Sequence, residues 1–268
     1  MSRPGPGWDP AQYLRYADDR SRPFFDLMAR VRVDAPGLVI DLGCGPGTLT
    51  KTLAQRWPDA TVIGVDSSRE MIAAAAETSA AFDRLTYVCA DLRDWQSDAA
   101  PDLVVSNATF HWIPDHLGLI EQIASSVAPG GAFAFGVPDN FAAPSHTVIR
   151  ELCRSPQWHD RLGGDSRQPD AAVAEPADYL AALTAAGLEP DVWQTTYLHV
   201  LQGDDPVVEW VKGTALRPAL TALADDEAAT SAFLAECSAA LGAAYPASSF
   251  GTVFPFRRTF AVGHRVAA

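Results

Sequence analysis

A glycine-rich segment that follows a short apolar run constrains the fold of this chain more than any other feature. Residues 38–42 are apolar apart from Asp41, and Gly43, Gly45 and Gly47 come next at alternate positions. Glycine allows a backbone to turn sharply and to approach a ligand more closely than a residue with a Cβ atom can. A helical pattern follows, so the segment predicts a buried strand, a ligand-binding loop and a helix, in that order.

A second acid has the spacing expected of a residue that binds a ribose. The next apolar run, 61–66, ends in Asp66, about 20 residues beyond the glycines. Ribose hydroxyls donate hydrogen bonds, and a carboxylate accepts them. As alternatives, Asp66 caps the helix expected from Ser67 or Ser68, and the glycines form a tight turn that binds nothing. The spacing favours a cofactor that contains a nucleoside.

Strand and helix patterns alternate through the first half of the chain. Strands are expected at 38–43, 61–66, 85–91, 103–107 and 131–137, and helices at 48–57, 68–80 and 115–128. This alternation predicts an α/β fold with a Rossmann-like, doubly wound and mostly parallel sheet. Ligands of such sheets bind at the carboxyl ends of the strands.

The segments on either side of this region are expected to be mainly helical or irregular. Helical spacing covers 10–33, and the proline-containing stretch 138–174 is expected to be irregular. Beyond it we expect a helix at 176–187, a strand at 192–201, helices within 204–244 and a strand at 257–266. We expect a single domain over 1–268, made of a helical segment at 1–36, a cofactor-binding core at 37–138 and cap insertions at 139–175 and 203–250.

Composition and charge narrow the classes of function. The net charge of −13 and the pI near 4.7 disfavour nucleic acid and anionic membranes as partners, because both attract a basic surface. The four cysteines have no C-x-x-C spacing and predict reduced thiols, and neither a metal site nor an apolar signal or membrane-spanning segment is expected. We expect a cytoplasmic protein.

Polar and aromatic residues follow the third and fourth predicted strands. Asp91 can accept a hydrogen bond from an adenine amino group while Leu92 packs on the ring, although aspartate is also common in simple turns. Phe110, His111 and Trp112 can form a wall around the reacting groups, or the aromatic rings can belong to the core. His111 is a candidate base, but a lone histidine more often only packs or donates a hydrogen bond.

A small anionic substrate would need a local cluster of arginines, because the overall field of the chain repels it. Adjacent strand residues point to opposite faces, so at most one of Arg257 and Arg258 should face a site. A solvated helix face is the alternative for the arginines near the N-terminus. The candidates are Arg15, Arg20, Arg22, Arg217, Arg257 and Arg258.

Several motifs together resemble the trans-aconitate 2-methyltransferase family, within the class I S-adenosylmethionine-dependent methyltransferases. The resemblance extends over almost the whole chain from Trp8. Its motifs are RSRPFFDL from Arg20, DLGCGPG from Asp41, GVDSS from Gly64, ADLRDW from Ala90, SNATFHWIPDH from Ser106, NFAAPSH from Asn140, TTYLH from Thr195, DPVVEWVKGTALRP from Asp205 and FPFRR from Phe254. The early motifs occur in many methyltransferases, whereas the late ones are specific.

The resemblance implies S-adenosylmethionine as cofactor, S-adenosylhomocysteine as product, and a monomethyl ester of trans-aconitate or a related small polycarboxylic acid. The implied cofactor residues are Asp41, Gly43, Cys44, Gly45, Gly47, Asp66, Ser67, Asp91, Leu92 and Asn107, with Asn107 at the amino-acid portion. The implied substrate residues are Arg20, Arg22, His111, Trp112, Tyr197, His199, Arg217, Arg257 and Arg258. Gly136 and Asp139 depart from the family pattern Gln-Met-Pro-Gly-Asn, which puts the identity of the acceptor in question.

An ionised carboxylate needs no general base, so we expect catalysis by orientation, with arginines holding the carboxylates that do not react. Three alternatives remain open. The chain methylates another small acid or a hydroxyl, in which case His111 becomes a base; it binds the cofactor without catalysis; or it is a nicotinamide dehydrogenase, which the glycine order disfavours. The oligomeric state is left open.

Overall fold

The computed structural model describes residues 17–77, 79, 82–162 and 173–267, without the side chains of 17–20. The described chain forms two compact units. The core unit holds residues 17–137, 173–195 and 259–267, and the helical unit holds residues 138–162 and 196–258. The two long strands β6 (Glu189–Leu201) and β8 (Gly251–His264) contribute residues to both units.

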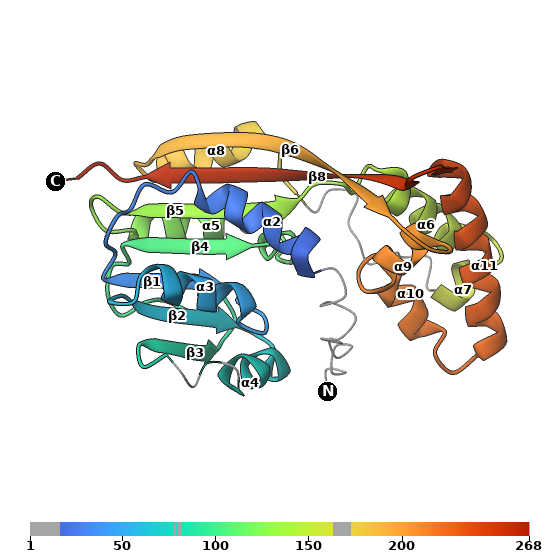
Figure 1. Cartoon of the computed structure of the whole chain (residues 1–268), viewed down its shortest axis with the longest axis horizontal. Coiled ribbons are helices and arrows are strands. Elements are labelled where there is room, and N and C mark those ends of the chain that lie inside the picture. The colour runs from blue at the N-terminus through green and yellow to red at the C-terminus, as the bar shows by residue number, and fades with distance from the viewer. Residues whose placement is uncertain (1–16, 78, 80–81, 163–172, 268) are drawn as a thin grey trace. The chain divides into compact units, whose positions relative to one another are not determined.

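The core unit is built on a sheet with the strand order β3-β2-β1-β4-β5-β8-β6. Its first five strands are β1 (Leu38–Leu42), β2 (Thr61–Asp66), β3 (Leu85–Cys89), β4 (Leu103–Asn107) and β5 (Ala132–Pro138). Neighbours among these five strands pair in parallel, and β8 runs in the opposite direction (Figure 1). The predicted α/β fold with a Rossmann-like, mostly parallel sheet is therefore confirmed.

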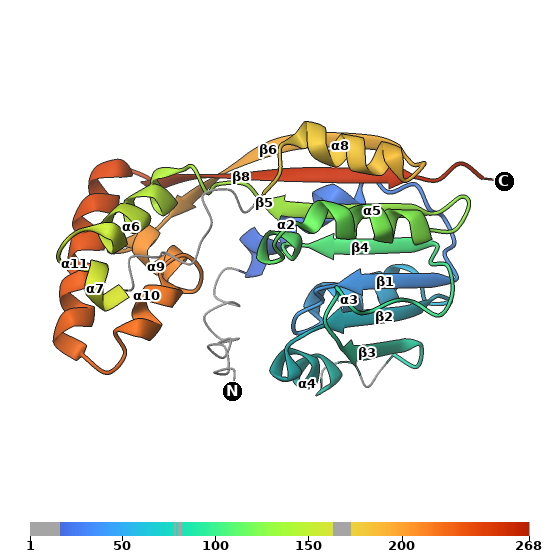
Figure 2. The same cartoon turned by 180° about the vertical axis from the view of Figure 1, so that it is seen from behind.

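Helices cover both faces of this sheet. The helices α2 (Ala17–Met28) and α3 (Thr48–Arg56) lie on one face, and α5 (His116–Ser126) and α8 (Pro176–Ala185) lie on the other (Figures 1 and 2). The helix α4 (Arg69–Glu77) contacts β2 and β3. Because both faces are covered, the central strands are almost continuously apolar, and all seven residues of β5 are buried.

The helical unit surrounds the remaining parts of β6 and β8. Its elements are α6 (Pro144–Arg154), α7 (His159–Leu162), α9 (Pro206–Lys212), α10 (Arg217–Ala222), α11 (Glu227–Ala244) and the short strand β7 (Ala247–Ser248), which pairs with β8. The long helix α11 packs on α6 and α9, and the ring of its Phe233 lies edge-on to Trp158. These contacts give the unit an apolar core of its own.

The structure corrects two sequence-based expectations in this unit. The stretch expected to be irregular contains the helix α6, in which Ile149 and Cys153 are buried and Pro144 stands at the first helical turn, where a missing N–H is tolerated. The last strand begins at Gly251, six residues before the predicted start at 257. Pro144 is one of the prolines from which irregular structure was predicted.

Two structural features are absent from the residues that the structure describes. No helix among them is long and apolar enough to cross a membrane. No group of three or more His, Cys, Asp or Glu side chains among them is arranged to hold a metal ion.

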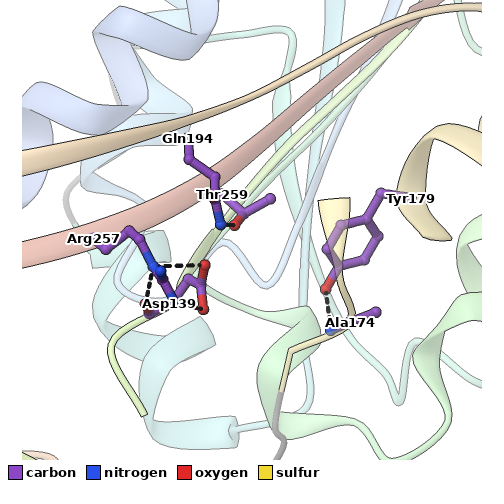
Figure 3. A network of polar contacts seen from close by, with 6 residues as sticks. All are labelled: Asp139, Ala174, Tyr179, Gln194, Arg257 and Thr259. Carbon is purple, nitrogen blue, oxygen red and sulfur yellow. Dashed lines mark hydrogen bonds and ion pairs between the residues drawn. The ribbon is translucent and has the colours of Figure 1, made fainter. Parts of the chain in front are cut away.

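A buried chain of hydrogen bonds fixes the loop that follows β4. The N–H of Ala174 donates to Tyr179 Oη at 3.2 Å, Tyr179 Oη lies 2.8 Å from His116 Nε2, and His116 Nδ1 lies 3.1 Å from the carbonyl oxygen of Ile113. The carbonyl oxygen of Ile113 can only accept, so His116 Nδ1 carries a proton and donates to it, and in the neutral ring Nε2 accepts from the Tyr179 hydroxyl. Burial lowers the pKa of His116 below 6.5, in agreement with this neutral state. Figure 3 shows the contact between Tyr179 and Ala174.

His116 should make folding stability depend on pH. Below about pH 6.5 the unfolded chain binds a proton at this position that the native chain excludes, so the native state loses stability as the pH falls. We expect His116→Asn to cost about 1–3 kcal/mol in the free energy of unfolding at pH 8 and less at pH 5. Denaturant unfolding from pH 5 to 8 measures the difference, with the exposed His159→Asn as control. A difference that stays constant with pH would contradict this role.

Candidate functional site

The glycine loop between β1 and α3 has a closed part and an open part. All three glycines have positive φ angles. A Cβ atom at Gly43 would lie 2.0 Å from Thr109 Oγ1, and one at Gly47 would lie 2.4 Å from Tyr87 Oη. A Cβ atom at Gly45, by contrast, would have no protein atom within 4 Å. Gly43 and Gly47 therefore serve packing, and Gly45 presents bare backbone to open space.

Asp41 lies buried beneath this loop. Its side chain accepts a hydrogen bond of 2.6 Å from Thr50 Oγ1 on α3, and only 3% of the residue is exposed. Burial raises the pKa of Asp41 to about 6, the Thr50 hydrogen bond lowers it, and the nearby charge of Asp66 raises it further. Asp41 therefore links β1 to α3, and burying its negative charge under the loop costs folding free energy.

Replacing this acid should stabilise the fold at neutral pH. Because the folded pKa is raised from 3.8 to about 6, the proton held by the native state contributes stability that is lost as the pH rises through 6. Asparagine keeps an acceptor for Thr50 without the charge. We expect Asp41→Asn to raise the free energy of unfolding at pH 8 by up to about 3 kcal/mol, and to change it little below pH 4.

Denaturant unfolding at both pH values measures this effect, with the exposed Asp59→Asn as control. If Asp41→Asn were less stable than the wild type at pH 8, the cost assigned to the buried charge would be wrong.

Asp66 holds the loop from the end of β2. One carboxylate oxygen accepts from the N–H of Gly45 at 3.0 Å, and the other accepts from the N–H of Ser68 at 2.8 Å. The second bond is the capping contact considered as an alternative. Each carboxylate oxygen can accept more than one hydrogen bond, so capping leaves acceptor capacity for a ligand hydroxyl. Asp66 is half-buried and the adjacent Ser67 is exposed.

Tyr87 is a residue of this region that sequence reasoning missed. Its ring fills the space above Gly64 on β2, where a Cβ atom would lie 2.6 Å from the ring, and its hydroxyl lies beneath Gly47. Tyr87 Oη is also 3.0 Å from Ser79 Oγ. The signal for this packing was a glycine inside an otherwise apolar strand, which often marks a close approach by another group.

Asp91 and Leu92 follow β3. Arg93 binds Asp91 through its backbone N–H and its guanidinium, with Nε 2.9 Å from Oδ1, and this hydrogen bonding lowers the pKa of Asp91 to about 2. Asp91 thus has the features of a turn acid, and its carboxylate oxygens retain acceptor capacity. Leu92 is buried and lines a cavity of about 200 Å³ between β1, β4 and α5. The glycine loop does not line that cavity.

Asn107 is the last residue of β4. Its Oδ1 is buried and has no hydrogen-bond partner among the described residues. A buried acceptor without a donor costs about 1–3 kcal/mol, which a donor on a bound ligand would recover. The end of β4 thus offers an acceptor, the end of β2 a carboxylate, and the loop between them a bare glycine. These two acceptors and the bare glycine fit a ligand with ribose hydroxyls and an ammonium group.

The aromatic segment after β4 divides between core and surface. Phe110 is fully buried against Phe133 and Phe135, as expected if it only packs. Trp112 is 53% exposed, and the ring of His111 lies 4.6 Å from it. Phe110 therefore belongs to the core and Trp112 does not. The exposed ring of Trp112 forms an aromatic surface that follows the carboxyl end of β4.

The helical unit contains the arginine pair of β8. Arg258 is buried, with 7% exposed, and its guanidinium lies 5.3 Å from the centre of the Phe256 ring. The Arg257 side chain is 47% exposed, and its Nε lies 2.9 Å from the backbone oxygen and 3.0 Å from Oδ2 of Asp139 (Figure 3). The two arginines point to opposite faces, as predicted, and Arg258 points inward.

The other predicted substrate residues occupy different environments. Tyr197 and His199 are buried on the same face of β6, and the ring of His199 lies 4.8 Å from that of Trp210. Arg217 is partly exposed at the first position of α10. Arg22 is exposed and lies 3.8 Å from Asp26, as on a solvated helix face. The side chain of Arg20, and Arg15 as a whole, lie outside the described residues.

A buried polar group in the helical unit was not anticipated. Arg150 is 8% exposed and donates to the carbonyl oxygen of Phe141 at 2.8 Å. Burial, followed by the charge of Arg150, lowers the pKa of the nearby His146 to about 4. Ser145 Oγ lies 3.1 Å from His146 Nδ1, and Asn140 Nδ2 lies 3.5 Å from it. Arg150 shares the buried face of α6 with Ile149 and Cys153, and sequence reasoning missed it because arginine is usually exposed.

Comparison with known proteins places this geometry in a family. Residues 39–131 match a family model described as a methyltransferase domain. A trans-aconitate 2-methyltransferase of Streptomyces avermitilis is 53% identical to the chain, over 98% of each sequence. The chain belongs to the trans-aconitate 2-methyltransferase family. A second member with that name, from Mycolicibacterium gilvum, is 46% identical over 95% of this chain and 98% of its own length.

Solved structures show the same fold as this family member at much lower identity. A putative methyltransferase of Haloferax volcanii, solved with the Trm112 methyltransferase activator, has a TM-score of 0.55 and 21% identity over 96% of each chain. A phosphoethanolamine N-methyltransferase 2 of Haemonchus contortus, in complex with S-adenosyl-L-methionine, has a TM-score of 0.53 and 15% identity, and the match covers 91% of this chain and 52% of that one. These likenesses extend to the fold alone.

Gly136 and Asp139, the two residues that depart from the family pattern, each lie against another side chain in the structure. A Cβ atom at Gly136 would lie 2.8 Å from the Phe260 ring, so the ring takes the space that a side chain would need. Asp139 pairs with Arg257, one of the five arginines implied for the substrate.

Proposed function

We propose that this chain transfers a methyl group from S-adenosylmethionine to one carboxylate of trans-aconitate or a closely related small polycarboxylic acid, and so forms a monomethyl ester. The observation that carries the proposal is the 53% identity, over nearly the full length, to an enzyme named for that reaction. S-adenosylhomocysteine is the second product. The net charge of −13 argues against nucleic acid and anionic membranes as partners. The exposed thiol of Cys89 suits the reducing cytoplasm.

The core unit supplies the residues that would hold the cofactor. S-adenosylmethionine provides an electrophilic methyl group on a sulfonium centre. Asp66 would accept from the ribose hydroxyls, and the unsatisfied Asn107 Oδ1 would accept from the ammonium group. Gly45 keeps side-chain atoms away from the nucleoside. The buried charge of Asp41 adds a favourable field for a cationic ligand.

The acceptor carboxylate needs no proton removed. Carboxylic acids are ionised near neutral pH, so the chain has only to bring the reactive oxygen into line at about 3–3.5 Å and to exclude the water that would solvate it. No acid or base residue is assigned. His111 contributes a polar edge beside Trp112.

Arg258 is the arginine best suited to hold a carboxylate that does not react. It is buried, and a planar guanidinium binds a carboxylate with two parallel hydrogen bonds. The same contact on the attacking oxygens would lower their nucleophilicity. We therefore assign Arg258 to an unreactive carboxylate, with Tyr197 and His199 as buried polar neighbours on β6.

His111→Ala separates this mechanism from methylation of a hydroxyl. Because a carboxylate needs no base, we expect the kcat for ester formation from trans-aconitate to stay within about threefold of the wild type. Methylation of a hydroxyl would lose about 100-fold or more on removal of its base. The assay follows ester formation from pH 6 to 9 in both proteins. Loss of turnover with intact acceptor binding would reject the proposed reaction type, and so would the absence of any ester from the wild type.

A further inference from the structure

The link between β3 and β4 leaves part of the sheet without a covering helix. The links β1–β2, β2–β3 and β4–β5 contain α3, α4 and α5, whereas residues 90–102 form turns and bends. The large apolar side chains at the start of this stretch are Leu92 and Trp95, and charged and small residues surround them. That pattern lacks the apolar stripe of a helix that packs on a sheet. A loop therefore covers the part of β1 and β4 that a helix would otherwise cover.

The cavity of about 200 Å³ lies under this loop. Ile40 and Val104 of the sheet, Leu119 and Ile123 of α5, and Trp95 of the loop are among the residues that line it (Figure 2 shows α5 on this face). All five belong to the apolar core of the core unit or pack against it. Side chains around an empty space lack contacts on one side. A dry apolar cavity of about 150 Å³ is enough to bind benzene, so this one has room for an aromatic ring.

The cavity lies apart from the residues proposed for the cofactor. Gly45, Asp66 and Asn107 do not line it. It reaches Pro101, which precedes β4, and Ser126, the last residue of α5. Both residues lie toward the amino end of β4, because α5 runs back from the carboxyl end of that strand to the start of β5. Ligands of a parallel sheet bind at the opposite, carboxyl edge.

The lining favours a neutral ligand. The described residues that line the cavity include no ionisable side chain, and its polar groups are the amides of Gln96 and Gln122 and the hydroxyls of Ser97 and Ser126. Burying a charge without a charged partner is costly, so both an anionic acid and a sulfonium cofactor are disfavoured here. An amide oxygen can accept from one N–H or O–H at the edge of a ring. The lining therefore matches an aromatic molecule with a single neutral polar group.

We propose that this cavity is a second binding site, which takes a neutral aromatic molecule of one ring or two fused rings with one N–H or O–H group. The ring lies on the apolar side chains of β1 and β4 and pairs with the ring of Trp95. Its polar group donates to the amide oxygen of Gln96 or Gln122. The site takes no part in methyl transfer, so the inference does not depend on the proposed function.

Indole is the probe for this site, because it has two fused rings and one N–H group. We expect the wild type to bind one indole per chain with a Kd of about 1 mM or tighter, measured by calorimetry. Methyl NMR during the titration should show shifts at Leu119 and Ile123, which line the cavity. Indole-3-acetate has the same rings and a negative charge, and it should bind at least about tenfold more weakly.

Two adjacent serines at the end of α5 give a matched pair of variants. Ser125 and Ser126 are both exposed, and the hydroxyl of each donates to a carbonyl oxygen of its own helix at 2.8 Å. Of the two, only Ser126 lines the cavity. Ser126→Phe should raise the Kd for indole at least about tenfold, because the phenyl ring buries itself in the space of the ligand. Ser125→Phe should leave the Kd within about twofold, and Ile123→Phe should act like Ser126→Phe.

Three results would overturn the inference: no saturable binding up to about 5 mM indole, NMR shifts confined to residues outside the cavity, or an equal Kd in the two serine variants. Displacement of indole by S-adenosylhomocysteine would also overturn it, because the cavity would then belong to the cofactor site. Thermal unfolding checks each variant, and if Ile123→Phe does not fold, the serine pair decides. Indole binding is measured without turnover, so a failure of methyl transfer would reject the proposed function and leave this inference standing.

Discussion

Gly45→Ala is expected to fold and yet to bind S-adenosylmethionine at least about 100-fold more weakly than the wild type. Gly45 has a φ of +53°, and a Cβ atom there would meet no protein atom within 4 Å. The substitution therefore costs only the strain of a left-handed backbone, about 1–2 kcal/mol. In the proposed complex the same Cβ atom would occupy the space taken by the cofactor.

Gly203→Ala is the matched control for that strain. Gly203 also has a positive φ, +93°, and an added Cβ atom would again meet nothing within 4 Å. Both variants should lose free energy of unfolding, Gly203→Ala the more because its φ of +93° lies outside the left-handed region of about +50° to +70°, and only Gly45→Ala should lose cofactor affinity. Thermal unfolding and calorimetric titration of each variant with S-adenosylmethionine give both quantities. Equal cofactor affinity in the two variants would show that the open side of the glycine loop is not the cofactor site.

Arg258→Lys should raise KM for the acid about 30-fold or more, with the dissociation constant of the cofactor changed less than twofold. Lysine keeps the positive charge but loses the planar pair of donors that matches a carboxylate. Truncating one member of a buried, hydrogen-bonded charge pair costs about 2–5 kcal/mol, so Arg258→Ala should have a still larger effect. Steady-state kinetics with the acid and calorimetry with the cofactor separate the two sites.

Arg257→Ala provides the comparison on the same strand. Its side chain is 47% exposed and already paired with Asp139, so KM for the acid should change less than about threefold. Thermal unfolding of the Arg258 variants checks that the buried position tolerates the change. If Arg257→Ala raised KM as much as Arg258→Lys, the assignment of the inward arginine would be wrong. A parallel loss of cofactor affinity in Arg258→Lys would also contradict it.

The strands β1 to β5 were predictable from sequence to within two residues, whereas β6 begins at Glu189, three residues before its predicted start. The run at 38–42 is apolar on both faces because helices cover both sides of the sheet, and the glycine loop ends it sharply. The site residues of β2 and β4 were predictable from the same apolar pattern, since each is the last residue of its strand. Asn107 and Asp66 both occupy such positions.

The contacts within the helical unit were less predictable, because they join residues far apart in the chain. Asp139 and Arg257 are separated by 118 residues, and neither position alone indicates a pair. Strand alternation predicted that at most one of Arg257 and Arg258 faces a site, but which of them is buried depends on how β8 packs in three dimensions. The helix α6 was missed because its first residue, Pro144, is a common helix start as well as a common loop residue.

Transfer of a labelled methyl group tests the central claim most directly. The purified protein is incubated with labelled S-adenosylmethionine and, separately, with trans-aconitate, cis-aconitate, isocitrate and citrate, and the product is treated with mild base. We predict labelled product from trans-aconitate that releases its label as methanol in base, as an ester does. Binding of the cofactor without label in any of the four acids, or a product stable to base, would contradict the proposed carboxylate methylation.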